Sequence, residues 1–164
     1  MAHVQTAYFE RRFDIAAARC QEVLDIAPKF APANFWLGTI FSQQPKKLDG
    51  AVKYLRRAIT LLGGSRGYPV ALGILGHALA RSDREIPARR LLIRLSKISE
   101  RQYISPVVPA FIHVGLGESK QALDCLEAAR AQRSNLLVHL GVEPIFDSLR
   151  TNSGFRTLLR SLGF

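Results

Sequence analysis

The first candidate for a chemical role is a glycine-rich run, residues 63–67 (GGSRG). This run matches the G-x-S-x-G pattern in which the serine of a hydrolase acts as nucleophile. That motif works only on a tight turn between a strand and a helix, with a histidine and an acid close by. Here the run follows a helical pattern, and the sequence shows no strand pattern. We interpret it as a loop between helices, with weak anion binding by Ser65 as the alternative.

The histidines, cysteines and acids give no further catalytic pattern. No histidine has a second metal-ligating residue at a suitable spacing. Cys20 and Cys125 lie in apolar helical stripes, so we interpret both as small core residues rather than as parts of a disulfide or zinc framework. No two carboxyl groups share an apolar setting that would make one of them a proton donor. We therefore expect no enzymatic activity, no cofactor and no bound metal.

Positive charge is the strongest bias in the composition, with a formal net charge of +10 and a pI of about 10.3. Such a balance favours anionic partners, nucleic acid among them. The densest basic cluster lies in one helical segment and contains Arg84, Arg89, Arg90, Arg94 and Lys97. We interpret it as a solvated outer helix face, with a polyanion-binding surface as the alternative. Binding of single-stranded nucleic acid favours aromatic residues interleaved with basic ones. Aromatic residues are not interleaved with these charges.

Four segments that could position such residues resemble one another. Each has an alanine near its start, and these alanines recur every 34 to 37 residues. Apolar residues follow each alanine at the fourth and seventh positions, which places them on one face of an α-helix. The alanines are Ala16, Ala51, Ala88 and Ala122. The pattern predicts four equivalent amphipathic helices.

A second apolar helix precedes each of these four, and two of them share a Leu-Gly pair, at 37–38 and 75–76. Glycine within a helix costs about 0.5–1 kcal/mol relative to alanine. It is therefore expected only where another helix approaches closely, as in an antiparallel helix hairpin. Ser105 followed by Pro106 is typical of a helix start, and Asp83 is predicted to cap a helix that begins at Arg84.

These features resemble the tetratricopeptide repeat, a helix–turn–helix unit of about 34 residues. The best match is the second unit, which has Leu37, Gly38 and Phe41 in its first helix and Ala51 and Leu55 in its second. The resemblance implies an all-α solenoid of three to four helix hairpins with a C-terminal helical cap. The expected units are about 1–30, 31–68, 69–102 and 103–133, and the cap is 134–164.

The last thirty or so residues resemble the segment that often closes tetratricopeptide regions of bacterial multidomain proteins. The matching residues include Phe146, Asp147, Leu149, Arg150 and Phe155. The resemblance implies that this chain is the C-terminal regulatory part of a larger kinase or transcription regulator. Physically, the end of a solenoid exposes an apolar face, which an amphipathic cap covers.

The first helices of such an array line an inner groove, and those within 69–80 and 105–117 are unusually apolar. Either this groove binds an apolar helix or peptide, or the tail partly covers it, which is the interpretation that we prefer. The candidate groove residues are Gln5, Tyr8, Phe35, Thr39, Ser42, Gln43, His77, Arg81, Phe111 and Val114. The sequence thus favours a protein-interaction scaffold, with nucleic acid or a second copy of the chain as other partners.

No apolar run reaches the roughly 20 residues that span a bilayer, and the N-terminus lacks the apolar centre of a secretion signal. We therefore expect a soluble, cytoplasmic protein.

Overall fold

The computed structural model describes residues 1–64 and 68–164, and every regular element in these residues is helical. The all-α class expected from the sequence is confirmed. The first four helices are α1 (Ala2–Phe9), α2 (Phe13–Ile26), α3 (Ala31–Ser42) and α4 (Leu48–Leu61), with a 3₁₀ turn η1 (Pro45–Lys47) before α4. The next four are α5 (Pro69–Arg81), α6 (Glu85–Ser99), α7 (Val107–Gly115) and α8 (Ser119–Ala131). The chain ends with η2 (Asn135–His139), η3 (Pro144–Leu149) and α9 (Ser153–Ser161).

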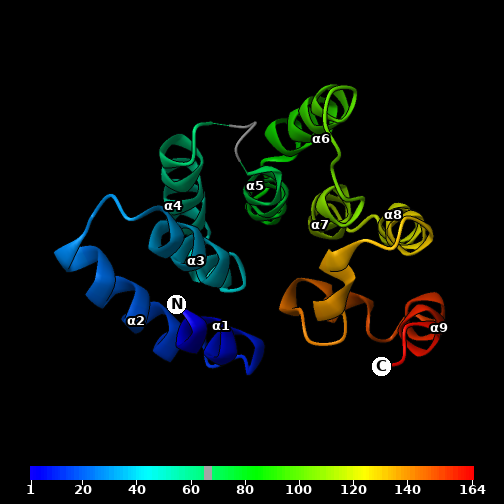
Figure 1. Cartoon of the computed structure of the whole chain (residues 1–164), viewed down its shortest axis with the longest axis horizontal. Coiled ribbons are helices and arrows are strands. Elements are labelled where there is room, and N and C mark those ends of the chain that lie inside the picture. The colour runs from blue at the N-terminus through cyan, green and yellow to red at the C-terminus, as the bar shows by residue number, and fades with distance from the viewer. Residues whose placement is uncertain (65–67) are drawn as a thin grey trace.

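The first eight helices follow one another around an open arc (Figure 1). Each odd-numbered helix packs against the next even-numbered one, and α2 packs on α3, α4 on α5, and α5 on α7. In Figure 1 the helices α1, α3, α5 and α7 line the inner side, and the orange segment with η2 and η3 lies within the arc. No helix within the described residues combines the length and apolar character needed to span a membrane.

The recurring alanines lie where neighbouring helices meet. Ala16, Ala51, Ala88 and Ala122 are each fully buried. A larger side chain at these places would push the packed helices apart, because protein interiors leave no spare volume. The small residue at one helical position in α2, α4, α6 and α8 therefore sets how closely each outer helix packs.

Glycine allows the closest helix contacts. A Cβ atom added at Gly38 would lie 2.6 Å from Leu55 Cγ of α4, as the hairpin interpretation predicts. At Gly76 the approaching residue is instead Ile112 of α7, at 2.6 Å. The second glycine therefore serves the packing of α5 on the next inner helix, and not its own hairpin.

One helix cap predicted from the sequence, in a turn between paired helices, is wrong. Asp83 does not cap α6, which begins at Glu85 without any side-chain cap. Asp83 instead adopts a left-handed conformation with φ of 58°, as do Arg11 (59°) and Gly117 (73°) in the equivalent turns. One left-handed residue reverses the chain in each of these three hairpins. Helix α7 begins at Val107 with Pro106 in the cap position, one residue later than predicted, although the Ser105 hydroxyl accepts a hydrogen bond from the Val107 amide at 3.2 Å.

The C-terminal segment, residues 134–164, is built from short, well-capped elements. Ser134, Glu143 and Asn152 each accept hydrogen bonds from backbone amides at the starts of η2, η3 and α9. Helix α9 packs against α8 and buries Phe155 and Leu158. This arrangement covers the last helix of the array, as expected of a cap.

Candidate functional site: the concave side and its C-terminal segment

Aromatic contacts hold the C-terminal segment against the concave side, which is the inner side of the arc in Figure 1. The ring centroid of Phe146 in η3 is 5.4 Å from that of Phe111 in α7. The His139 ring of η2 is 4.9 Å from the ring of Phe9 in α1. Because η2 and η3 contact both ends of the arc in this way, the segment bridges the first and the last inner helix. The structure thus shows the partial self-cover that the sequence analysis preferred.

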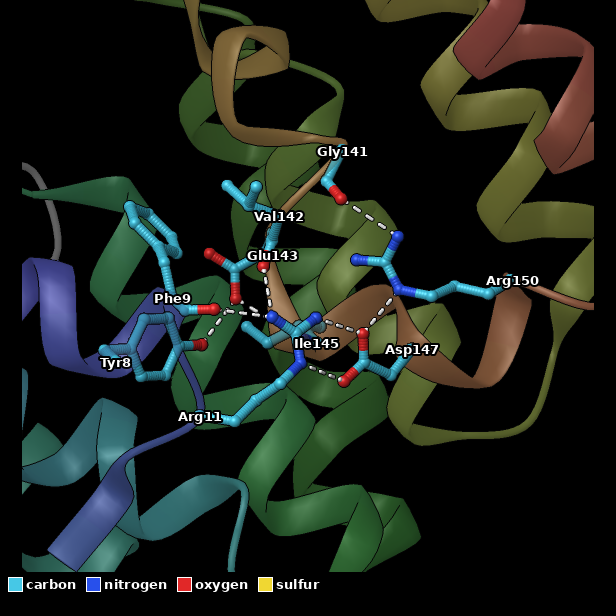
Figure 2. A network of polar contacts seen from close by, with 9 residues as sticks. All are labelled: Tyr8, Phe9, Arg11, Gly141, Val142, Glu143, Ile145, Asp147 and Arg150. Atoms are coloured by element: carbon cyan, nitrogen blue, oxygen red, sulfur yellow. Dashed lines mark hydrogen bonds and ion pairs between the residues drawn. The ribbon is translucent and has the colours of Figure 1, made fainter. Parts of the chain in front are cut away.

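A buried hydrogen bond fixes this bridge. The Tyr8 hydroxyl donates to the Glu143 carboxylate, whose Oε1 also accepts the Ile145 amide at 3.2 Å (Figure 2). Burial, followed by the neighbouring Glu143 charge, raises the pKa of Tyr8 well above its usual value. Burial also raises the pKa of Glu143, and the Tyr8 hydrogen bond opposes this shift. The raised pKa keeps the phenol protonated, so the Tyr8 hydroxyl donates and Glu143 Oε1 accepts.

Arg11 forms a second link from the α1–α2 turn to the segment. Its Nη2 and Nε lie 2.6 and 3.1 Å from the two carboxylate oxygens of Asp147. Arg150 donates to the same carboxylate at 2.6 Å and to the Gly141 carbonyl oxygen at 2.9 Å (Figure 2). Burial disfavours ionisation of Asp147, but the two arginines outweigh it, and the pKa of that carboxyl is lowered.

The segment leaves an aromatic cavity of about 220 Å³ on the concave side. Side chains from α1, α3, α5, α7, η2 and η3 line it, together with Tyr68 just before α5. Its aromatic members are Phe9, Phe35, Trp36, Tyr68, Phe111, His139 and Phe146. Trp36 is half-buried and Tyr68 is 37% exposed, so part of the lining is open to solvent.

A second, more polar cleft of about 390 Å³ lies beside η3, near the ends of α5 and α7. Its lining includes His77 and Arg81. The His77 Nδ1 is 3.1 Å from the Phe111 carbonyl oxygen, so Nδ1 carries the proton. Burial, and then the Arg81 charge, lowers the pKa of His77 to about 3. Arg81 donates to the Ser42 carbonyl oxygen at 2.5 Å.

Eight of the ten predicted groove residues line one of these two cavities, whereas Tyr8 and Ser42 line neither. Gln5, Phe35, Thr39 and Phe111 line the aromatic cavity, whereas Gln43, His77, Arg81 and Val114 line the polar cleft. Six of the ten are buried, so most of the predicted residues belong to the packed interior and are not exposed surface. The buried members are Tyr8, Phe35, Thr39, Ser42, His77 and Phe111.

Sequence reasoning missed the contributions of the C-terminal segment to the site. His139, Glu143 and Phe146 line the aromatic cavity, although none of them was among the predicted groove residues. Glu143 precedes Pro144, which is the local pattern of a helix start. In the structure Glu143 does cap the start of η3. No short-range signal pairs it with Tyr8, because the two residues are 135 positions apart.

The predicted polyanion-binding residues are exposed on or beside α6, on the outer side of the arc. Arg84 forms an ion pair with Asp49, and Arg89 forms ion pairs with Glu85 and Glu118. Glu118 also contacts His113 Nδ1 at 2.7 Å. Arg94 has a partner as well. These contacts join α6 to its neighbours in the array and neutralise part of the basic cluster.

Other sequence motifs yield no assembled site. Ser65 lies outside the described residues, while Gly63 and Gly64 have φ values of 84° and 82°. Cys20 is buried and Cys125 is half-buried, and burial raises the pKa of Cys20 to about 12. Within residues 1–64 and 68–164, no three histidine, cysteine or acidic side chains come together as metal ligands.

Comparison of this sequence with models of protein families, and with curated proteins, finds no match.

Proposed function

We propose that this chain is a tetratricopeptide-type module of four helix pairs that binds a protein partner on its concave side. The observation that carries the proposal is the aromatic cavity, because all four inner helices and the C-terminal segment contribute to it. Stacked helical repeats typically bind ligands on such a shared concave surface. The C-terminal segment is, in this proposal, a permanent part of the binding surface.

The composition of the cavity supports partner binding. Tryptophan and tyrosine are enriched at the centres of protein interfaces, where they contribute most of the binding energy. Trp36 and Tyr68 both line the cavity and both keep exposed surface. Both rings contact Phe35 in edge-to-face geometry, with centroid distances of 5.7 and 5.1 Å. This packing holds the two rings in place before a partner arrives.

The burial of the C-terminal segment favours binding beside it rather than in its place. Leu140 is fully buried and Phe146 is 1% exposed. Releasing the segment would return both side chains to water, at about 1.5–3 kcal/mol for each large apolar residue. It would also break the hydrogen bond between Tyr8 and Glu143. A partner therefore gains more by contacting the exposed cavity rim than by displacing the segment.

Site-specific photo-crosslinking tests the proposal. A photoreactive amino acid at Val70, on the cavity rim, is compared with one at Ile93, which is 59% exposed on the outer helix α6. The protein is produced in its native host and irradiated. We expect a discrete adduct from position 70 and none from position 93. Equal adducts from both positions, or none from position 70, would contradict partner binding at the cavity.

Polyanion binding is the second candidate function, and the ion pairs of α6 count against it. Arg84 and Arg89 already contact acidic side chains of this chain. Binding to phosphates would have to compete with these contacts. A mobility-shift assay with an oligonucleotide at low salt decides the question, because binding driven by phosphate contacts weakens steeply as salt rises.

A further inference from the structure

The aromatic cavity contains one carboxylate and no lysine or arginine among the described residues that line it. That carboxylate belongs to Glu143, a partly buried residue that caps the start of η3. The remaining lining is aromatic or aliphatic, apart from Gln5, Thr39 and His139. The Thr39 hydroxyl donates to the Phe35 carbonyl oxygen at 2.9 Å within its own helix. The formal charge of the lining is therefore carried by Glu143.

Only one of the two carboxylate oxygens of Glu143 is used by the fold. Oε1 accepts hydrogen bonds from the Tyr8 hydroxyl and the Ile145 amide. Oε2 accepts no hydrogen bond from residues 1–64 or 68–164, and Figure 2 shows it pointing away from Tyr8 and Ile145. A carboxylate has room for about four hydrogen bonds. Oε2 is thus available to a donor that enters the cavity.

Among residues 1–64 and 68–164, Glu143 has no ion-pair partner. Arg11 is the cation whose charge acts on it, but the Arg11 guanidinium contacts Asp147 and the carbonyl oxygens of Phe9 and Val142. Asp147 adds a repulsive negative charge, and burial removes water from the carboxylate. The ionised side chain is therefore under-compensated, and a positive group beside Oε2 would stabilise it.

The rings around the cavity favour the same kind of ligand. The faces of tryptophan, tyrosine and phenylalanine rings attract ammonium groups within about 6 Å, most strongly when water is excluded. Trp36, Phe35 and Tyr68 form one series of edge-to-face contacts in the cavity lining. The cavity volume of about 220 Å³ is below the roughly 300–1,000 Å³ of most sites for whole small molecules. It suits a single long side chain.

We propose that the aromatic cavity binds the alkylammonium side chain of a lysine on the protein partner. The ammonium group pairs with Glu143 Oε2, and the four-carbon stem lies against the aromatic wall. This inference rests on the proposed function, because it specifies which partner residue enters the cavity.

The single tryptophan of the chain provides a direct reporter, because Trp36 lines the cavity. The full chain is titrated with n-pentylammonium, a probe for the lysine side chain, while the Trp36 fluorescence and its indole N–H resonance are followed. 1-Pentanol and pentanoate have the same length but no charge or a negative charge. We expect saturable shifts with pentylammonium, binding at least about tenfold weaker with pentanol, and no binding of pentanoate. Equal binding of pentylammonium and pentanol would overturn the proposal.

Two variants show whether Glu143 supplies the selectivity. Glu143→Gln removes the charge and keeps an oxygen that can accept the Tyr8 hydrogen bond. Asp124→Asn is the control, because it removes one negative charge from an exposed position of α8 that does not line the cavity. We expect E143Q to lose the preference for pentylammonium over pentanol and D124N to retain it. Thermal unfolding confirms that each variant is folded. Retained selectivity in folded E143Q would overturn the assignment.

A third comparison distinguishes a side chain from a free amine. The peptides Gly-Gly-Lys-Gly-Gly and Gly-Gly-norleucine-Gly-Gly are titrated in the same way. Preferential binding of the lysine peptide supports the proposal, and binding of pentylammonium without the lysine peptide would replace the partner side chain by a free amine. Failure of all amine probes, with the photo-crosslink at position 70 intact, would overturn this inference and leave the proposed function standing.

Discussion

The Tyr8 hydroxyl donates a hydrogen bond to the Glu143 carboxylate across 135 positions of the chain. It thereby joins the first helix of the arc to the segment that follows the last. Tyr8 is fully buried, and its ring also contacts Trp36 at a centroid distance of 5.6 Å. One side chain thus connects the packing of α1, the aromatic cavity and the C-terminal segment.

Replacing Tyr8 by phenylalanine tests this connection. Tyr8→Phe keeps the ring but leaves Glu143 Oε1 without its side-chain donor. Oε1 keeps the hydrogen bond from the Ile145 amide. A hydrogen bond typically contributes about 0.5–1.5 kcal/mol, and up to about 3 kcal/mol when one partner is charged, so we expect the unfolding free energy to fall by roughly 1–3 kcal/mol. Urea titration followed by circular dichroism measures it. Tyr54→Phe is the control, since Tyr54 is half-buried and its hydroxyl has no hydrogen bond to the described residues. Equal losses in both variants would contradict a specific role for the Tyr8 hydroxyl.

The pair Arg11–Asp147 should couple measurably, although both side chains are about 40% exposed (38% and 43%). Exposed ion pairs contribute about 0.2–1 kcal/mol, and a bidentate geometry favours the upper part of that range. A double-mutant cycle with Arg11→Ala and Asp147→Ala is expected to give a coupling energy of roughly 0.5–1 kcal/mol, smaller in 1 M salt.

The matched control for this cycle is the pair Arg19–Glu22, which lies within α2 and is 63% and 61% exposed. Its coupling energy should be about 0.2–0.5 kcal/mol, the range for neighbours on one helix. A coupling as large as that of Arg11–Asp147 would show that the contact to the C-terminal segment adds nothing beyond an ordinary surface ion pair.

The helical class could be read from the sequence because it depends on local periodicity. Alanines such as Ala51 and Ala88, followed by apolar residues at helical spacing, identify the buried face without reference to distant residues. The close approach at Gly38 follows from the same reasoning, since a glycine within a helix requires a packing cause. Both features are fixed within about 20 residues of chain.

The candidate site could not be read in this way, because it depends on contacts between distant segments. Glu143 has the local pattern of a helix start, and nothing in its neighbourhood indicates that its carboxylate meets Tyr8. Likewise, Phe111 was predicted to line a groove that the tail partly covers, but nothing in the sequence indicates that Phe146 is the residue that packs against it. Helical periodicity identifies apolar faces, but it does not say which segment covers them.

The close packing at Gly38 predicts that alanine is harmful there despite its higher helix propensity. The added Cβ would lie 2.6 Å from Leu55 Cγ and 2.9 Å from the Leu55 backbone nitrogen. Overpacking of this kind typically costs 1–3 kcal/mol, which exceeds the gain of about 0.5–1 kcal/mol from propensity. We expect Gly38→Ala to lower the melting temperature.

Gly50 provides the comparison for this substitution, because its nearest neighbour is the ring of the half-buried Phe41, at 2.9 Å, and not a backbone atom. The ring can rotate aside, so Gly50→Ala should be close to neutral. If the melting temperature changes as little in Gly38→Ala as in Gly50→Ala, the α3–α4 contact is looser than the structure indicates.

His77 should make stability depend on pH in a defined direction. Burial lowers its folded-state pKa to about 3, against 6.5 for an unperturbed imidazole. The unfolded chain therefore binds a proton below about pH 6.5, whereas the folded chain does not until about pH 3. The stability that neutral His77 contributes is present above pH 6.5 and is lost as the pH falls toward 3, by up to about 1.4 kcal/mol per pH unit.

Replacing this residue by asparagine isolates the effect. The amide of His77→Asn can still donate to the Phe111 carbonyl oxygen but does not titrate. Carboxyl groups also change charge as the pH falls. The informative quantity is therefore the difference in unfolding free energy between the wild-type protein and His77→Asn at each pH. We expect that difference to shift steadily in favour of the variant as the pH falls. Parallel stability curves would show that His77 becomes protonated in the folded state, and that the polar cleft is more hydrated than its packing implies.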